Sequence, residues 1–491
     1  MCVCVSVGVC VCVCAYVCLC VCVEMSKSPV NKKSKSEFLT TSKCEDIGVL
    51  FPRIIVPTSK VDLKKWAVVA CDQYTSEDDY WQRVEQFVGD SFSTLRLTFP
   101  EIYLEKGKDE EIISGIVSSM QNYDIGDVFE EKSEPGIILV ERTLREGTLR
   151  RGIVLALDLE EYDYKIGSTS LIRATEKTIE SRIPARLAVR RKVSLELPHI
   201  IVLIDDPTDS VLSSMWQRHM TDDAPAQYET ELMENSGHLR GVYVNDPSSL
   251  SLLCDQIRIL ANPKTFAQKY NLNEGEKDVL LFAMGDGNHS LATAKAHWEE
   301  IKQSPNYRDD HPARYALVEL QNCQDPTLVF EPINRLVFGT EKTVGNIFTD
   351  IKKYFGTDRI VIEEGDEAFE KATLCESNTC KFGYVFQSKK GSIQILNPTK
   401  VLHVAEATDF LDHWLPQHES TRIDYVHEMT AIDRFCATDD QFNIGFVFSA
   451  MEKSDLFKTV ILDGALPRKT FSMGNAHDKR FYFEARRIAP M

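Results

Sequence analysis

The sequence lacks the features that would place it at once among membrane or disordered proteins. After residue 45 it has no long stretch without charge, whereas a membrane-spanning helix needs about 20 apolar residues in a row. Glycine (24 residues) and proline (19 residues) are at ordinary levels, and the 43% hydrophobic and 26% charged content is that of a globular protein. A chain of 491 residues is expected to form two or three domains.

Common catalytic signatures are missing too. The sequence has no G-x-x-x-x-G-K-[ST] phosphate loop, no H-E-x-x-H zinc motif and no G-x-S-x-G nucleophile turn. Basic residues are outnumbered, because 74 Asp and Glu oppose 56 Lys and Arg and leave a formal net charge of −18. Since nucleic-acid binding requires a basic surface, we expect no nucleic-acid partner, no membrane partner, and a small-molecule substrate instead.

Cysteine is concentrated at the N-terminus. Residues 1–23 hold 8 of the 15 cysteines and mostly alternate cysteine with valine, as a TGTGTG repeat read as coding sequence would. We expect this tract to be non-native, with Met25 as the natural start. A signal peptide is the alternative, but no basic segment precedes the apolar run and no small-residue cleavage site is evident. Residues 26–45 are polar and aperiodic, so residues 1–45 are predicted to be a non-native or disordered leader.

The remaining cysteines do not have the pattern of a disulfide framework, because they are odd in number and scattered along the chain. This usage favours a reducing compartment, and we expect a cytoplasmic protein. The residues concerned are Cys44, Cys71, Cys254, Cys323, Cys375, Cys380 and Cys436.

Strand and helix patterns alternate irregularly after the leader. Apolar, β-branched runs predict strands at 135–142, 150–164 and 199–207, which makes the first part of the chain strand-rich. We therefore predict a mixed α/β (α+β) fold. Its main region is expected at 46–340 and contains the candidate site, and a C-terminal α+β region is expected at 341–491.

One strand-turn-helix unit is the main candidate for a binding site. The strand is predicted at Val279–Met284 and the helix at Ser290–Ile301, with the turn GDGNHS at 285–290 between them. The helix has apolar residues at the spacing of one buried face: Leu291, Ala294, Trp298 and Ile301. A helix start presents backbone N–H groups beside the positive end of the helix dipole, so this turn predicts an anion site for phosphate.

The small and polar residues of the turn fit phosphate binding. Gly285 and Gly287 permit positive φ and close approach of a ligand. Asn288 or Ser290 can cap the helix, and both are expected at the phosphate together with Gly287. The alternative is an ordinary tight turn, in which Ser290 is only the helix cap.

Two side chains of the turn suggest catalysis. Asp286 can hold a metal ion or orient an imidazole, and His289 can act as acid, base or phosphate carrier near neutral pH. A surface position for His289 is the alternative. Basic residues near other strand ends, among them Arg335 and Lys469, could clamp a phosphate, although solvated charges are the simpler interpretation. A further basic group occurs at His477–Arg480.

Several segments together resemble the family catalogued as domain of unknown function 1015. They include WAVVACDQYTSEDDYW at 66–81, GDGNHSLATAKAHWEE at 285–300 and LPRKTFSMGNAHDKRFYFEAR at 466–486. The resemblance extends from about residue 47 to the end of the chain, which leaves the Cys-Val tract outside it. The family's Asp-Gly-His-His-Arg turn is similar to that of the ParB and sulfiredoxin-like group.

That group includes nucleotide-hydrolysing partition proteins, ATP-using sulfiredoxins and kinases that phosphorylate free serine. Asp286 and Gly287 match the first two positions of its turn and His289 the fourth, whereas Asn288 and Ser290 replace the first His and the Arg. The resemblance therefore implies a nucleotide site whose arginine, a natural phosphate clamp, is absent from the turn.

The first hypothesis is a nucleotide-dependent phosphotransferase or hydrolase that acts on a small metabolite, with free serine as a candidate. ATP or ADP with Mg²⁺ would be the cofactor, Asp286 the metal ligand, and His289 with Asp286 the catalytic pair. Arg335 or Lys469 would supply the missing phosphate clamp. A non-catalytic nucleotide or metabolite-binding protein is the second hypothesis, and a ParB-like nucleic-acid-associated protein, which the net charge disfavours, is the third.

Overall fold

A computed structural model describes residues 2–5, 9–12, 43–75, 77–104, 107, 109–123, 125–221, 223–339, 344–374, 380–418, 420–427, 429–437 and 443–490. The chain divides into two compact units, Met1–Lys43 and Cys44–Met491. In the first unit, β1 (Cys2–Val5) pairs antiparallel with β2 (Val9–Cys12). Residues 13–42, which make up most of the predicted leader, lie outside the described residues.

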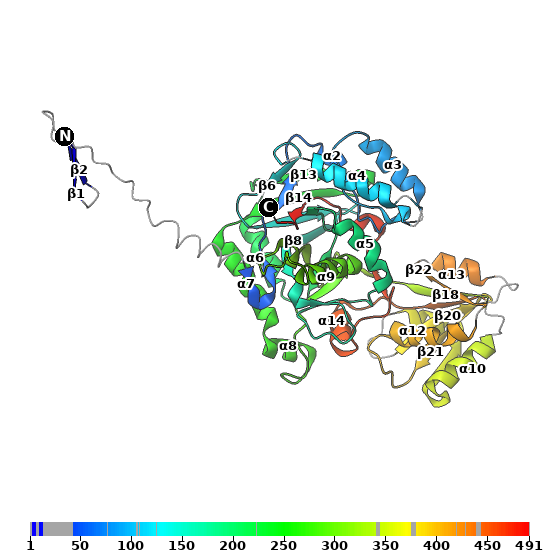
Figure 1. Cartoon of the computed structure of the whole chain (residues 1–491). Helices are drawn as coiled ribbons and strands as arrows, with labels where there is room; N and C mark the ends of the chain where they lie inside the picture. The colour runs from blue at the N-terminus through cyan, green and yellow to red at the C-terminus, as the bar shows by residue number, and fades with distance from the viewer. Residues whose placement is uncertain are drawn as a thin grey trace. The chain divides into compact units, whose positions relative to one another are not determined.

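The second unit has the predicted mixed α/β fold (Figure 1). Its larger sheet has the strand order β13-β14-β7-β8-β16-β12-β15-β10-β9, and β3 and β4 join it beside β8. The strands are β3 (Lys43–Cys44), β4 (Val49–Leu50), β7 (Ile137–Thr143), β8 (Leu149–Asp158), β9 (Tyr162–Asp163), β10 (Ile172–Arg173), β12 (Ile201–Ile204), β13 (Tyr228–Glu231), β14 (His238–Val244), β15 (Phe282–Asp286) and β16 (Tyr315–Asn322). The three strands predicted for the first part of the chain therefore form as β7, β8 and β12.

Alternate residues of the central strands enter two different cores, as the period of two in a strand requires. In β8, Ile153 and Leu155 belong to one core and Val154 to the other. Helices α6 (Ser210–His219), α7 (Pro247–Ala261) and α9 (Asn288–Lys302) contribute to the first core. Helices α2 (Leu63–Trp66) and α3 (Asp78–Val88) contribute to the second, near α4 (Asp109–Asn122). The site helix α9 also packs against α5 (Ile183–Arg190), and α8 (Pro263–Tyr270) follows α7.

A second sheet forms in the C-terminal part of the chain, with the antiparallel order β19-β21-β20-β23-β18-β22. Its strands are β18 (Asn334–Phe338), β19 (Ile360–Glu364), β20 (Cys380–Phe386), β21 (Lys389–Ile395), β22 (Arg422–Val426) and β23 (Ile444–Val447). One face packs with α10 (Val344–Phe355), α12 (His403–Trp414) and α14 (Lys453–Leu462), and the other with α11 (Asp366–Thr373) and α13 (Met429–Cys436). The remaining strands form two-stranded pairs: β5 (Ile55–Pro57) with β6 (Phe129–Glu131), β11 (Leu195–Glu196) with β25 (Arg486–Arg487), and β17 (Phe330–Pro332) with β24 (Phe471–Met473).

The last residues of the chain return to the first part of it. Tyr482 N donates to Val68 O at 2.9 Å, and Trp66 Nε1 donates to Phe483 O at 3.0 Å. The sequence pattern predicts a strand across residues 479–486. The observed strand, β25, is shorter and begins only at Arg486, where it pairs with β11. We call residues 479–488 the C-terminal segment. It lies among the N-terminal elements and not with the second sheet.

A disulfide, Cys44–Cys254, fastens β3 to α7. The expectation of unpaired cysteines is therefore wrong at this position, because two cysteines that are 210 residues apart in sequence meet in space. Cys71, Cys323, Cys380 and Cys436 are free, and Cys375 lies outside the described residues. Within the residues that the structure describes, every helix is too short or too polar to cross a bilayer.

Arg480 anchors the C-terminal segment. Its guanidinium pairs with Glu319 and with Glu484, the latter at 2.6 Å, and its Nε donates to Pro198 O at 3.1 Å. Arg480→Ala would leave two buried carboxylates without their cation. We expect it to lower the free energy of unfolding by about 3–5 kcal/mol in urea denaturation.

Arg308→Ala is the matched control, because Arg308 is exposed and its one ion pair within the described residues is with the exposed Asp310. We expect a change below about 0.5 kcal/mol there. Equal losses in the two variants would show that the C-terminal segment is not held by this buried cluster.

Candidate functional site

The predicted strand-turn-helix unit forms, with shifted ends. Strand β15 begins at Phe282 and extends to Asp286, and α9 begins at Asn288. Leu291, Ala294 and Trp298 are buried as the helical spacing predicts. Gly287 is the N-cap with φ +80°, and a Cβ there would lie 3.1 Å from Ile200 Cα. Glycine is therefore required at this position by both conformation and space.

Gly285 is required for a different reason than the one predicted. Its φ is not positive, but a Cβ would lie 3.0 Å from both Leu203 Cγ and Met473 Cε. Close packing of β15 against Leu203 of β12 and Met473 of β24 leaves little room for a side chain. This glycine thus serves packing, and Gly287 alone makes the turn.

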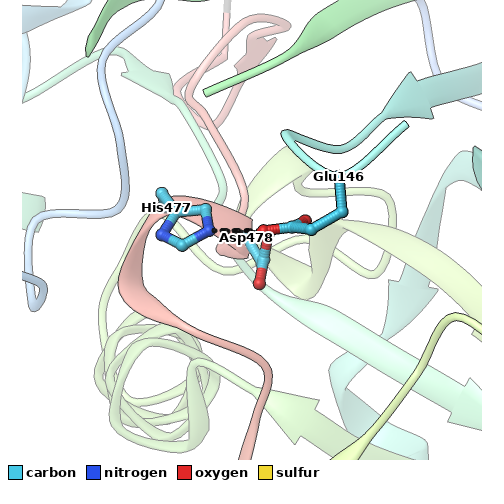
Figure 2. A group of neighbouring side chains, drawn as sticks. All are labelled: Glu146, His477 and Asp478. Atoms are coloured by element: carbon cyan, nitrogen blue, oxygen red, sulfur yellow. Dashed lines mark hydrogen bonds and ion pairs between the residues drawn. The ribbon is translucent and has the colours of Figure 1, made fainter. Parts of the chain in front are cut away.

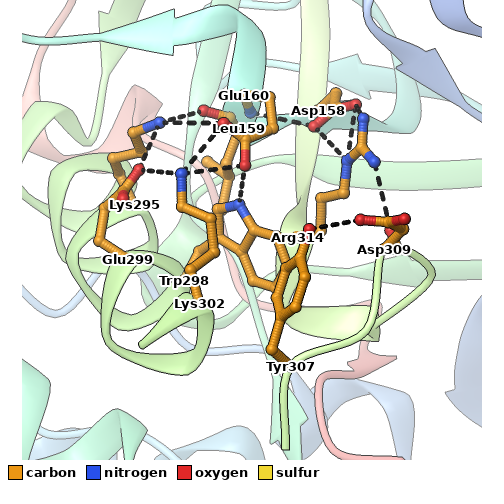
Figure 3. Close-up of polar contacts among 10 residues, drawn as sticks. All are labelled: Asp158, Leu159, Glu160, Lys295, Trp298, Glu299, Lys302, Tyr307, Asp309 and Arg314. Atoms are coloured by element: carbon orange, nitrogen blue, oxygen red, sulfur yellow. Dashed lines mark hydrogen bonds and ion pairs between the residues drawn. The ribbon is translucent and has the colours of Figure 1, made fainter. Parts of the chain in front are cut away.

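The direction of α9 is fixed at its other end by polar contacts with the segment that follows β8 (Figure 3). Trp298 Nε1 donates to Glu160 Oε1 at 2.7 Å, and Lys295 Nζ donates to Leu159 O at 2.8 Å. Lys302 Nζ lies 3.1 Å from the same Glu160 carboxylate. Because these contacts join the helix to a central strand of the larger sheet, they hold the first turn of α9 at a fixed place.

The first turn of α9 presents free donors. Ser290 N and Leu291 N both donate to Gly287 O, at 2.9 and 3.1 Å. In the described part of the chain, no acceptor takes the N–H of Asn288 or of His289. Asn288 Oδ1 is buried and has no hydrogen-bond partner among the same residues. Neither Asn288 nor Ser290 caps the helix, so the predicted capping role is wrong and the donors remain available to an anion.

A lysine converges on this turn from a distant part of the sequence. Lys479 Nζ lies 3.3 Å from Asp286 Oδ2 and 3.4 Å from Ser472 Oγ. The other oxygen, Asp286 Oδ1, accepts a hydrogen bond from Gly287 N at 2.9 Å. In the sequence Lys479 is one of several basic residues at 477–480. Nothing in the sequence pattern indicates which of them folds back onto the turn.

Glu176 is a site residue that sequence analysis missed. Its segment lies next to β15 in space, because the hydroxyl of the preceding residue, Thr175 Oγ1, donates to Met284 O at 2.8 Å. Burial and, to a smaller extent, the charge of Asp286 raise the pKa of Glu176 to about 7, against hydrogen bonds from the backbone at Lys469 and Thr470. The carboxyl group of Glu176 thus responds to the charge of Asp286.

His289 lies at the turn but is held by the backbone. Its Nε2 accepts a hydrogen bond from Ile179 N at 3.2 Å. Burial, together with the charges of Arg186 and Arg182, lowers the pKa of His289 to about 4. The imidazole is therefore neutral at physiological pH, and one of its nitrogens is already engaged.

The two predicted clamps differ in position. Arg335 is fully buried, and its Nη atoms donate to the carbonyls of Ile333, Arg468 and Lys469 and to Thr408 Oγ1. Its guanidinium thus holds the loop at 468–469 and does not serve as the predicted phosphate clamp. Lys469 has φ +57° and an exposed side chain beside Glu176. It remains a candidate for phosphate contact at the edge of the site.

His199 is the second site residue that sequence analysis missed. It is buried before β12, with Nε2 3.3 Å from Ser290 Oγ and Nδ1 2.7 Å from Tyr482 Oη. Its Nε2 also lies 3.8 Å from Asp72 Oδ2. Burial would raise the pKa of Asp72, but His199, a hydrogen bond from Gln73 and the charge of Lys479 outweigh it and lower that pKa.

A cavity of about 180 Å³ opens beside Ser290 and His199. Its lining residues come from the segments around α5, α9 and β11 and from the loop that precedes α4: Cys71, Leu97, Thr98, Phe99, Glu101, Leu104, Met120, Ala185, Arg186, Val189, Arg190, Val193, Leu195, Glu196, Leu197, Pro198, His199, Ile200, Ser290, Thr293 and Tyr482. The turn and the cavity together form one candidate site, with Ser290 and His199 at their junction.

A separate group of ligand-type side chains lies elsewhere (Figure 2). His477 Nε2 is 3.3 Å from Glu146 Oε1 and 3.5 Å from Asp478 Oδ1. Among the described residues this is the one group of three or more His, Cys, Asp or Glu side chains with metal-ligand spacing, and Asp286 does not belong to it. The hydrogen bond between His477 and Glu146 and the ion pair between His477 and Asp478 account for the close spacing of this group.

Comparison with known proteins agrees with the resemblance found in the sequence. A family model described as "Protein of unknown function (DUF1015)" matches residues 55–414. The chain belongs to the DUF1015 family. No curated protein sequence matches it.

Solved structures resemble this DUF1015 chain only distantly. A free serine kinase in complex with AMP has 10% sequence identity and a TM-score of 0.35, over 68% of this chain and 92% of the kinase. A conserved hypothetical protein from Pyrococcus furiosus has 10% identity and a TM-score of 0.34, over 68% and 95%. SbnI from Staphylococcus aureus, truncated at its C-terminus, has 7% identity and a TM-score of 0.31, over 67% and 85%.

The geometry of the turn predicts the effect of Gly287→Ala. The alanine must keep the left-handed backbone conformation of Gly287, and its Cβ would press on Ile200. We therefore expect the free energy of unfolding to fall by about 2–3 kcal/mol. Gly275→Ala is the matched control, because Gly275 has φ +81° with open space around it. We expect a loss of about 1 kcal/mol there, measured in the same urea titration. Equal losses would contradict the close contact at Gly287.

The buried imidazole predicts a pH dependence of stability. Because the pKa of His289 falls from 6.5 to about 4 on folding, its contribution is complete above pH 6.5 and is lost as pH falls toward 4. After allowance for solvent screening, we expect the wild type to lose about 1–2 kcal/mol more than His289→Gln between pH 7 and 4.5. His413→Gln, at an exposed position, should follow the wild type. Parallel curves for all three proteins would refute this assignment.

Proposed function

We propose that this protein is a nucleotide-dependent phosphotransferase or phosphohydrolase that acts on a small metabolite. The observation that carries the proposal is the open first turn of α9 with the ammonium of Lys479 beside it. Two backbone N–H groups that have no acceptor among the described residues, the positive end of a 15-residue helix and a lysine support a phosphate site here. The ParB and sulfiredoxin-like character of the turn is part of the same proposal.

The phosphate contacts follow from the placement of the donors. The N–H groups of Asn288 and His289 and Nζ of Lys479 hold the transferring phosphoryl group and stabilise the charge that develops on its oxygens. Asn288 Oδ1, which is buried without a partner in the described part of the chain, is an acceptor for a ligand donor. His289 serves here through its backbone, and its ring positions the segment before α5.

His199 is better placed than His289 to move a proton. Tyr482 Oη accepts a hydrogen bond from Cys71 N at 3.2 Å. When Nδ1 of His199 donates to Tyr482 Oη, Nε2 carries the lone pair that faces Ser290 and the cavity, and this is the tautomer that the proposed role uses. Such an imidazole can take the proton from an attacking hydroxyl group or water molecule.

The carboxyl groups at the turn fit a magnesium ion. Mg²⁺ is usually held by one or two carboxylates together with substrate phosphates. Asp286 and Glu176 would supply them, because the charge of Asp286 acts on the carboxyl group of Glu176. When bound, the ion neutralises phosphate charge. In the structure Lys479 pairs with Asp286 Oδ2.

We propose ATP or ADP as the nucleotide. We also propose that the protein is cytoplasmic. Free serine kinase is bound to AMP in one solved structure and a mutant of it to ADP in another. These similarities are too distant to carry an argument about this chain, so the proposal rests on the site itself. A non-catalytic nucleotide-binding protein is the second candidate, because the ring of His289 is held by the backbone.

Lys479→Ala tests the phosphate site. We expect ADP with Mg²⁺ to bind the purified wild-type protein in isothermal titration calorimetry, and the variant to bind about 10- to 100-fold more weakly, since a charge-assisted hydrogen bond is lost. Lys264→Ala, at an exposed position at the start of α8, is the control and should bind like the wild type. Absence of nucleotide binding, or equal affinity in all three proteins, would rule out the proposed site.

His199→Gln separates catalysis from binding. We expect ATP or ADP consumption in the presence of a metabolite mixture to fall about 10²- to 10⁴-fold while the dissociation constant of ADP stays within about twofold. A wild-type protein that binds nucleotide without consuming it would favour the non-catalytic function. A variant that consumes nucleotide as fast as the wild type would remove His199 from the mechanism.

A further inference from the structure

The cavity beside His199 is largely apolar. Leu97, Phe99, Val193, Leu195 and Leu197 are among its walls. At the end of the wall that the first turn of α9 forms, Ser290 Oγ and His199 Nε2 are 3.3 Å apart. This end adjoins the first turn of α9, so a ligand in the cavity would direct its polar end toward the proposed phosphate site.

The charged residues of the cavity wall are already paired. Arg186 forms an ion pair with Glu101, and Arg190 forms one with Glu196 at 2.6 Å. Glu196 is paired further with Arg486 at 2.9 Å and accepts a hydrogen bond from Leu317 N at 2.8 Å. Among the residues that line the cavity, two arginines and two glutamates thus cancel. A ligand with its own carboxylate or ammonium group would lose hydration without gaining a counter-ion.

We infer that this cavity binds the acceptor substrate, and that the acceptor is an uncharged small alcohol with an apolar body rather than a free amino acid. The size agrees, because a cavity of about 150 Å³ can hold benzene, and about 180 Å³ leaves room for one or two further atoms. The inference rests on the proposed function, which supplies the phosphate donor.

The transfer step balances with a nucleoside triphosphate as the donor. The acceptor oxygen forms a bond to the terminal phosphorus, and the bond from that phosphorus to its bridging oxygen breaks. The nucleoside diphosphate leaves with the bonding electrons, and the hydroxyl proton goes to Nε2 of His199. With a diphosphate donor, the monophosphate leaves in the same way. Free serine would place its ammonium and carboxylate groups among apolar walls and charged side chains that already have partners. This disfavours serine as the acceptor.

Four small probes of similar size test the ligand class on the full chain. Benzyl alcohol has the apolar body and the hydroxyl group, toluene lacks the hydroxyl group, benzoate carries a negative charge, and L-serine carries both charges. We expect titration calorimetry to show benzyl alcohol binding at least tenfold more tightly than benzoate or L-serine, and several-fold more tightly than toluene. Equal or tighter binding of benzoate or L-serine would overturn the inference.

Two variants locate the binding. Val193→Phe, at a half-buried position of the cavity wall, places a ring in the cavity and should weaken benzyl alcohol binding at least tenfold. Val361→Phe, at an exposed position of β19, should not. Ser290→Ala is the second variant, which should weaken benzyl alcohol binding without changing that of toluene. Benzyl alcohol affinity that is unchanged in both Val193→Phe and Ser290→Ala would overturn the inference.

Turnover separates this inference from the proposed function. With ATP and Mg²⁺, benzyl alcohol should yield benzyl phosphate, followed by ³¹P NMR. If ADP binding depends on Lys479 but no probe alcohol binds or is phosphorylated, the proposed function stands and the acceptor inference is wrong. If benzyl alcohol binds but no nucleotide binds, the proposed function fails, and the acceptor role of the cavity fails with it.

Discussion

Burial of the C-terminal segment is the interaction on which the site depends. Arg480 pairs with Glu319 of β16 and with Glu484, and so inserts the last residues of the chain among the first elements of the fold. Its neighbours then reach the site from both sides. Lys479 meets Asp286 at the turn, and Tyr482 meets His199 at the cavity. Without this segment the turn of α9 would have neither its lysine nor the partner that orients its histidine.

Local sequence patterns are sufficient to predict the secondary structure at the site. The period of the apolar residues in α9 predicts its buried face, because Leu291 and Trp298 lie on one side of a helix. The β-branched runs predict β7, β8 and β12 for the same local reason. The end of the chain differs. The pattern at residues 479–485 predicts a strand, but these residues form isolated bridges with distant segments, such as that of Phe481 with Val69. Partners at this sequence distance leave no local signal.

Side-chain roles depend on such distant partners, and this is why several were unpredictable. His289 follows the family pattern, yet the backbone at Ile179 engages its ring, and burial keeps it neutral. His199 has no motif around it and becomes a candidate base only through Tyr482 and Ser290. Arg335 is basic and near a strand end, as a clamp should be, but its partners are backbone carbonyls. The strand-turn-helix unit of the candidate site could be predicted from sequence. The contacts of each side chain within it required the three-dimensional arrangement.

The central claim is that the first turn of α9 binds phosphate through its backbone. The most direct measurement is the ¹⁵N–¹H NMR shift of the Asn288 and His289 amides in protein labelled selectively at Asn and His, titrated with inorganic phosphate and then with ADP. The account predicts saturable downfield shifts of both amide protons, larger than those of any labelled residue outside the site. Unchanged amides at Asn288 and His289, while ADP binds and shifts resonances elsewhere, would contradict it.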